Sequence, residues 1–254
     1  MCYIAKVMLR FEKKTILGVP IASLTIQEIP KIILLWMKED GKLTFFYVNA
    51  HCLVLASQNP EYKNILKQAT LVYSGGIGPI LASKILGKPL KERTPTPDFI
   101  NSIFEHLQNE NSSVYLIGST SDSIKKAVTI IRKKFPKLKI DGYHSGFFSP
   151  SEETIVIKQI NKLKPSVILV GMGSPSQEYW ISKNKEHLNA KVFWAVGAMF
   201  DVISGKLPRA PKWIQSLRME WLYRLFQEPK RLWKRYTFGI LQFILMVIKD
   251  FYRR

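Results

Sequence analysis

Two glycine-rich stretches of this 254-residue chain have the composition of ligand-binding loops. Gly75, Gly76 and Gly78 separate a short apolar run from a helical pattern. Gly171 and Gly173 occupy the same position after a longer apolar run. Glycine lets the backbone approach a ligand closely, and the free N–H groups at a helix N-terminus attract anions. Both stretches are candidate ligand sites. The alternative is a pair of tight turns, since the second lacks the third glycine of a dinucleotide fingerprint.

Polar side chains accompany these glycines. Ser174 can cap the helix that follows, with Pro175 in its first turn, and the Gln177 amide then projects near the helix N-terminus. An ordinary solvated glutamine is the alternative for Gln177. Asn49 follows another apolar run, where it is either a site residue or a turn asparagine.

Two further side chains could act on a phosphate or a proton. Arg93 lies in a polar stretch broken by prolines, and it can bind a phosphate through two parallel hydrogen bonds or simply stay solvated. Of the four histidines, His51 is the one that follows a predicted strand end next to Asn49. It is therefore the histidine best placed to carry a proton.

The sequence lacks the motifs of several classes of enzyme. The chain has no D-x-D pair for a metal-bound nucleotide, no G-x-x-x-x-G-K-[ST] loop and no G-x-S-x-G elbow. Cys2 and Cys52 have neither a metal-ligand spacing nor the number needed for a disulfide framework. We therefore expect no metal and no cofactor, and a reducing cytoplasm as the compartment. Residues 1–14 hold four basic residues and no long apolar segment, so we expect no secretory signal.

The elements that must position these residues alternate between strands and helices. The run at 167–170 shows no polar alternation, which indicates a parallel strand covered on both faces. We predict an α/β fold in which a mostly parallel, Rossmann-like sheet is wrapped by helices and binds ligands beyond the carboxyl ends of its strands. The predicted strands are 14–20, 43–49, 71–73, 114–118, 139–143, 167–170 and 192–196.

The formal charge of +19 calls for an anionic partner, and roughly half of it lies in residues 206–254. Tryptophans and tyrosines interleave with the arginines there, and an apolar run at 238–248 is too short to span a bilayer. This pattern favours a helix on an anionic membrane surface over a nucleic-acid-binding arm. We predict an α/β core at 1–205 and a basic, aromatic, helical C-terminal appendage at 206–254 that associates with membranes and binds no nucleic acid.

Seven sequence blocks, taken in order, resemble one family. They are YSGGIGP at 73–79, ER at 92–93, GYHSGFF at 142–148, VGMGSPSQE at 170–178, VGAMFD at 196–201, RAP at 209–211 and EWLYRLFQEPKRLWKRY at 220–236. From about residue 49 to residue 236 the chain resembles the WecG/TagA/CpsF glycosyltransferases.

This resemblance implies a cytoplasmic enzyme, peripheral on the inner face of the cell membrane. It would move a sugar, N-acetylmannosamine or a related hexose, from a UDP-sugar to a polyprenyl-diphosphate-linked saccharide, with inversion at the anomeric carbon. Family members make teichoic-acid linkage units and other surface polysaccharides. The donor sugar, the acceptor saccharide and assembly into a homo-oligomer stay open.

The resemblance also implies roles for individual residues. The family residues that match Asn49, Arg93 and Gln177 line the active-site pocket, and arginines of the C-terminal segment close over the diphosphate. We expect Arg209, in the RAP block, to bind substrate as well. The candidates for the closing arginines are Arg218, Arg224, Arg231 and Arg235, of which Arg224 and Arg231 are the surest matches.

One departure from the family concerns the general base. Many members carry an aspartate at the position of Gly75, and some carry a threonine at the position of Tyr47. Either another group such as His51 or Asp98 takes the acceptor's proton, or deprotonation contributes little, or the activity is lost. In the last case the chain would be a non-catalytic homologue that binds UDP-sugar or lipid carrier as a partner subunit. A basic nucleic-acid-binding protein is the less favoured alternative.

Overall fold

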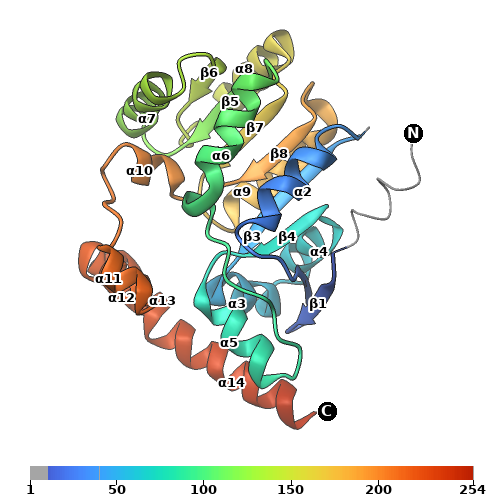
Figure 1. Cartoon of the computed structure of the whole chain (residues 1–254), viewed down its shortest axis with the longest axis vertical. Helices are drawn as coiled ribbons and strands as arrows, with labels where there is room; N and C mark the ends of the chain where they lie inside the picture. The colour runs from blue at the N-terminus through green and yellow to red at the C-terminus, as the bar shows by residue number, and fades with distance from the viewer. Residues whose placement is uncertain (1–10, 40, 254) are drawn as a thin grey trace.

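The computed structural model describes residues 11–39 and 41–253 and is organised around a six-stranded parallel sheet (Figure 1). Its strands lie in the order β4-β3-β8-β7-β5-β6. This confirms the predicted α/β fold. The bounds are β3 (Leu43–Val48), β4 (Leu71–Ser74), β5 (Ser113–Gly118), β6 (Lys139–His144), β7 (Val167–Gly171) and β8 (Val192–Ala195).

The first predicted strand is instead a separate antiparallel hairpin, made of β1 (Lys13–Ile16) and β2 (Val19–Ala22). Leu17 and Gly18 both adopt positive φ angles, of 50° and 80°, and so reverse the chain where a single strand was expected. Residues 1–10, which carry most of the expectation about a secretory signal, lie outside the described residues.

Helices cover both faces of the sheet and contribute to two separate hydrophobic clusters. One face carries α3 (Ala50–Gln58), α4 (Pro60–Gln68), α5 (Ile77–Ile85), α8 (Pro150–Leu163), α9 (Ser176–Asn184) and α14 (Phe238–Tyr252). The other carries α2 (Glu28–Trp36), α6 (Thr96–Asn109), α7 (Ser121–Lys134) and α10 (Met199–Ile203). The remaining helices are η1 (Lys185–His187), α11 (Lys212–Ser216), α12 (Glu220–Gln227) and α13 (Pro229–Tyr236).

Local sequence signals explain where several of these elements begin and end. All five residues of β7 are buried, as its unbroken apolar run predicts. Asn59 accepts a hydrogen bond from the backbone N–H of Tyr62, and Pro60 occupies the first turn of α4, so this pair separates α3 from α4. Ser149 and Glu152 form a reciprocal capping box at the start of α8.

The connections after β7 and β8 diverge. These two strands are neighbours in the sheet, but α9 packs on one face and α10 on the other. Open α/β sheets bind their ligands at such a topological switch point, beyond the carboxyl ends of the strands. The second glycine-rich stretch therefore begins at the carboxyl end of β7, where the sequence analysis predicted a ligand site.

The C-terminal helices run along one side of the molecule, and α14 lies alongside α3 and α5 (Figure 1). Phe243 and Val247 of α14 are buried in the same cluster as α3. The side-chain amide of Gln58 donates a hydrogen bond to the side-chain oxygen of Gln242 at 3.1 Å. No helix in the ranges 11–39 and 41–253 has both the length and the apolar character needed to cross a bilayer.

The buried Trp194 offers a test of the core. Its indole N–H donates to the Tyr73 hydroxyl at 2.9 Å, and that hydroxyl lies 2.7 Å from the Thr96 hydroxyl. Trp194→Phe removes the donor and leaves a cavity, so we expect unfolding in urea to show a loss of about 1–3 kcal/mol. Trp213→Phe, at an exposed position, is the matched control and should change stability by less than about 0.5 kcal/mol. Equal effects of the two substitutions would contradict this account of the core.

Candidate active site

Loops from four strands meet at the carboxyl edge of the sheet. Asn49 follows β3 and begins α3, where its side-chain oxygen accepts a hydrogen bond from the backbone N–H of Cys52 at 3.1 Å. Gly75 follows β4, and its N–H donates to the carbonyl of Val48 at 2.9 Å. The structure therefore places Asn49 as a helix cap, next to the first glycine-rich stretch.

Packing against α3 and the neighbouring loops requires several of the predicted glycines. A Cβ atom on Gly78 would lie 2.7 Å from Ala50 Cβ, and one on Gly76 would lie 3.2 Å from Asn49 Cβ. A Cβ on Gly171 would lie 2.7 Å from the carbonyl oxygen of Gly197. The close backbone approach expected from these glycines is thus made, at least in part, to other loops of the protein.

Tyr47, the penultimate residue of β3, lies between two glycines. A Cβ on Gly75 would come within 2.7 Å of the Tyr47 ring, and a Cβ on Gly197 within 2.3 Å of its hydroxyl oxygen. Gly75 does not have a positive φ, whereas Gly173 does, at 81°. The backbone angles at position 75 therefore allow a side chain, but the Tyr47 ring leaves no space for one.

Gln177 joins the loops after β7 and β8. Its side-chain oxygen accepts from the N–H of Gly197 at 2.9 Å, and its amide nitrogen donates to the hydroxyl of Ser174 at 3.2 Å and to the carboxylate of Glu178 at 2.8 Å. The side chain has no solvent exposure. The alternative of a solvated glutamine is wrong, and the amide lies in the interior rather than projecting outward.

The predicted helix cap at Ser174 is also wrong. Helix α9 begins at Ser176 after Pro175, without a side-chain cap. The helix begins two residues after Ser174, and the Ser174 hydroxyl donates to Oε1 of Glu178 at 2.8 Å.

Glu178 is the main feature that the sequence analysis missed. The side chain is completely buried, and burial raises the pKa of its carboxyl to about 7. Oε1 accepts from Ser174 and Gln177, whereas Oε2 has no hydrogen-bond partner among the described residues. A glutamate in the first turn of a helix is usually solvated, so its sequence position gave no signal of burial.

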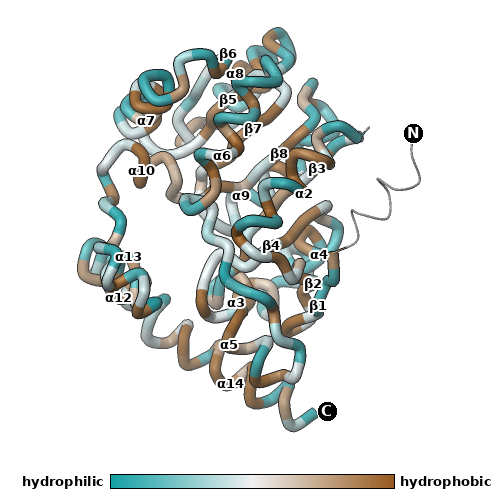
Figure 2. The backbone as a smooth tube through the Cα atoms, viewed as in Figure 1, coloured by the Kyte–Doolittle hydropathy of each residue, from teal (hydrophilic) through white to brown (hydrophobic). Residues whose placement is uncertain are grey.

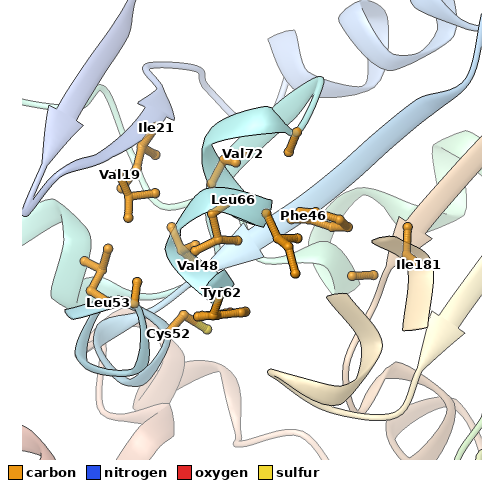
Figure 3. Close-up of a cluster of buried hydrophobic side chains, with 14 of the residues drawn as sticks. Val19, Ile21, Phe46, Val48, Cys52, Leu53, Tyr62, Leu66, Val72 and Ile181 are labelled. Carbon is orange, nitrogen blue, oxygen red and sulfur yellow. The ribbon is translucent and has the colours of Figure 1, made fainter. Parts of the chain in front are cut away.

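Three weakly acidic groups face Glu178. Burial, followed by the charge of neighbours, raises the pKa of Tyr47 to about 12 and raises the pKa values of the Cys52 thiol and the Tyr62 hydroxyl. Cys52 and Tyr62 lie side by side in the core (Figure 3). The Tyr62 hydroxyl, like Glu178 Oε2, has no hydrogen-bond partner among the residues that the structure describes. Tyr47, Cys52 and Tyr62 therefore stay protonated and uncharged near neutral pH.

His51 lies near the C-terminal segment. Burial, and then the charge of Arg235, lower the pKa of His51 to about 4. The same arginine, from α13, acts electrostatically on Tyr47 at the end of β3 and on Cys52 in the first turn of α3. A histidine with this pKa is neutral near pH 7 and is a weak base.

The other predicted arginines pair with two carboxylates of the C-terminal segment. Arg93 and Arg209 both pair with Glu220, and Arg209 also binds Asp98 at 2.6 Å. These contacts connect α12 to the loop before α6 and to α6 itself. Asp98, considered above as a proton acceptor, is thus already neutralised by an arginine.

A second carboxylate, that of Glu228, forms ion pairs with one arginine of α12 and one of α13. Arg224 and Arg231 pair with Glu228 at 3.8 Å and 2.5 Å, at the point where Pro229 divides the segment into two helices. Arg218 has a φ of 60° and lies in the turn between α11 and α12. The structure therefore brings together Arg93 with Arg209, and Arg224 with Arg231, as two ion-pair groups.

The raised pKa of Glu178 predicts how stability changes with pH. Between the model-compound value of 4.5 and about 7, the folded protein keeps a proton that the unfolded chain has lost, so this group's contribution to stability falls as pH rises through that window. We expect Glu178→Gln to remove this fall and to be the more stable protein above pH 7, by ~3 kcal/mol at most. Chemical unfolding at several pH values measures this, with the exposed Glu105→Gln as control. Parallel pH profiles for Glu178→Gln and wild type would contradict it.

Comparison with known proteins adds to this geometry. A model of the glycosyl transferase WecG/TagA/CpsF family matches residues 14–254. A relative in Bacillus subtilis strain 168 is 33% identical over 80% of this chain and 78% of its own length. Relatives in Bacillus spizizenii and Staphylococcus aureus strain MW2 are 31% and 28% identical, over 76% and 87% of this chain and 74% and 87% of their own lengths. All three are named N-acetylglucosaminyldiphosphoundecaprenol N-acetyl-beta-D-mannosaminyltransferase. The resemblance seen in the sequence is confirmed, and the chain belongs to the WecG/TagA/CpsF family of glycosyltransferases.

Proposed function

We propose that this protein transfers N-acetylmannosamine, or a related hexose, from a UDP-sugar to a polyprenyl-diphosphate-linked saccharide during assembly of a teichoic-acid-type or other cell-surface polymer. The name of the relatives describes transfer of N-acetylmannosamine to a diphosphoundecaprenol-linked sugar. The observation that carries the proposal is that the charge of Arg235, from the C-terminal segment, acts on His51 and Tyr47 at the carboxyl edge of the sheet.

The arginines supply the charge that this reaction needs. A diphosphate group binds guanidinium groups through charge-assisted hydrogen bonds, and stabilising the departing UDP in the same way lowers the barrier to transfer. Glu228 holds Arg224 and Arg231 in place without cancelling both charges, because one carboxylate pairs with two arginines. Arg93 and Arg209 are instead balanced by Glu220 and Asp98. The arrangement leaves positive charge for a phosphorylated substrate.

Tyr47 explains sterically why position 75 carries no aspartate. Its ring fills the space that a side chain at Gly75 would need. We infer that this protein uses a site with a tyrosine in place of the aspartate, so that restoring the carboxylate would also require a smaller residue at position 47. His51 is a poor substitute base, because its pKa is held at about 4.

Membrane association is proposed through the exposed side of α14. Leu241, Ile244, Leu245 and Ile248 are each 45–57% exposed, while Phe243 is buried against the core. Leu81 and Ile85 of the adjacent α5 are also exposed, and Figure 2 shows apolar residues along both helices. Nearby exposed lysines are Lys84, Lys88 and Lys249. An apolar face bordered by lysines suits the anionic inner leaflet of the cell membrane.

The proposed division of the chain into domains concerns the same C-terminal helices. Residues 1–205 include the whole sheet and both helical layers except α14. We propose that this core folds without residues 206–254, which would form the membrane-associating appendage. Because α14 buries Phe243 and Val247 on the core, a truncated core would expose an apolar surface and serve poorly as a test of membrane binding.

The transfer reaction can be tested directly. With UDP-N-acetylmannosamine and a short-chain polyprenyl-diphosphate N-acetylglucosamine, we expect a new lipid-linked disaccharide, detected by mass spectrometry. Loss of a charge-assisted contact to the diphosphate in Arg224→Ala should lower kcat/KM by roughly 10–100-fold. Arg132→Ala, on the exposed surface of α7, is the control and should leave kcat/KM unchanged. Absence of product from a panel of UDP-sugars would favour the non-catalytic homologue.

Membrane binding is tested with surface variants that leave the core intact. Leu241→Glu with Leu245→Glu places two charges on the proposed membrane face, so cosedimentation with phosphatidylglycerol vesicles should weaken at least about tenfold. The matched control is Ile130→Glu with Ile155→Glu, on exposed positions of α7 and α8. Equal binding by the two double variants would show that α14 is not the membrane contact.

A further inference from the structure

Glu178 is a buried carboxyl group for which packing gives no reason. It has no exposed surface, and within residues 11–39 and 41–253 no lysine or arginine forms an ion pair with it. Burying a carboxyl without a cation is unfavourable, and groups kept in such places are often functional. It follows Gln177 at the junction of the β7 and β8 loops, and open α/β sheets bind their ligands at such junctions.

One hydroxyl connects this carboxyl to the surface of the site. Ser174 is partly exposed, and its Oγ donates to Glu178 Oε1 at 2.8 Å. The amide nitrogen of Gln177 donates to both Ser174 Oγ and Glu178 Oε1, at 3.2 Å and 2.8 Å, and so fixes the two groups relative to each other. A ligand hydroxyl that reaches Ser174 is therefore separated from a buried carboxylate by a single side-chain hydroxyl.

We propose that the Ser174 hydroxyl receives the proton of the attacking acceptor sugar and passes its own proton to Glu178. The proposal rests on the transferase function above. The acceptor oxygen bonds to the anomeric carbon of the donor as its O–H bond breaks, and UDP leaves with the electrons of the old glycosidic bond. Ser174 Oγ gains the acceptor's proton while losing its own to Glu178 Oε1, and the carboxylate becomes a neutral acid. The proton later returns to solvent by the reverse route.

The surroundings of Glu178 make its carboxylate a suitable proton acceptor. The titratable groups that face it are Tyr47 from β3, Cys52 from α3 and Tyr62 from α4, all of which stay protonated near neutral pH. Arg235 of α13 acts on Tyr47 and Cys52. Because burial raises the pKa of the carboxyl to about 7, it binds a proton more readily than His51, and the best general base has a pKa near the working pH.

The pH dependence of kcat tests the relay. We expect wild-type kcat to rise about tenfold per pH unit below pH 7 and to level off above it, as the carboxyl ionises. Ser174→Ala and Glu178→Gln should each lower kcat by roughly 10²–10⁴-fold and remove this rise, with the double variant no worse than either single variant. Ser174→Thr, which keeps the hydroxyl, should restore most of kcat and the pH profile.

Two controls separate proton transfer from a merely structural effect. Ser176→Ala, at the exposed first residue of α9, should match wild type. The affinity for UDP, measured by calorimetry, should stay within about threefold of wild type in each variant. If Glu178→Gln does not fold, the comparison of Ser174→Ala with Ser174→Thr decides alone.

The possible outcomes are distinct. An active wild type whose kcat and pH profile are unchanged in Ser174→Ala or Glu178→Gln overturns the relay and leaves the transferase function standing. A loss of kcat with the pH profile retained also overturns it, because it would assign these residues a structural role only. A wild type that forms no product with any donor overturns both proposals together.

Discussion

The side-chain amide of Gln177 is the interaction on which the rest of the site depends. Neighbouring strands β7 and β8 send their chains to opposite faces of the sheet, and a backbone hydrogen bond from the Val196 N–H to the Val170 carbonyl, at 2.8 Å, extends their pairing to the start of the second loop. The Gln177 amide connects the two loops farther on, because its oxygen binds Gly197 and its nitrogen binds Ser174 and Glu178. Since a buried amide left without partners is costly, the two loops must stay in register.

This constraint determines what its neighbours can be. Gly197 has a positive φ of 58° and faces the Tyr47 hydroxyl, so no side chain fits between them. Tyr47 in turn reaches Gly75 on the opposite neighbour of β3, which excludes a side chain there too. A side chain at position 75 and the tyrosine ring at position 47 therefore compete for the same volume. The proposal that this protein works without an aspartate at position 75 thus involves both positions.

The sequence predicted the fold better than the site, for a physical reason. An unbroken apolar run such as Val167–Gly171 has few alternatives to a buried parallel strand, and the order of strands and helices then restricts the topology. The chemistry of the site depends instead on which polar side chains are buried by the fold. By position in the sequence, Ser174 fits a helix cap and Glu178 fits a solvated first turn. In the folded protein the two form a hydrogen bond, and Glu178 is fully buried near Cys52 and Tyr62 from other helices. Such long-range burial leaves no local pattern in the sequence.

The excess positive charge is distributed in a way that links the proposed membrane face to the site. Glu220 and Glu228 each pair with two arginines, so they orient α12 and α13 while leaving net positive charge along them. Helix α14 continues directly from this segment and packs on α3, the helix that begins at Asn49. A lipid-linked diphosphate held at the exposed side of α14 would therefore meet these arginines before it reached the strand ends. The packing of one helix on α3 thus positions both the proposed membrane contact and the charge that a lipid-bound substrate requires.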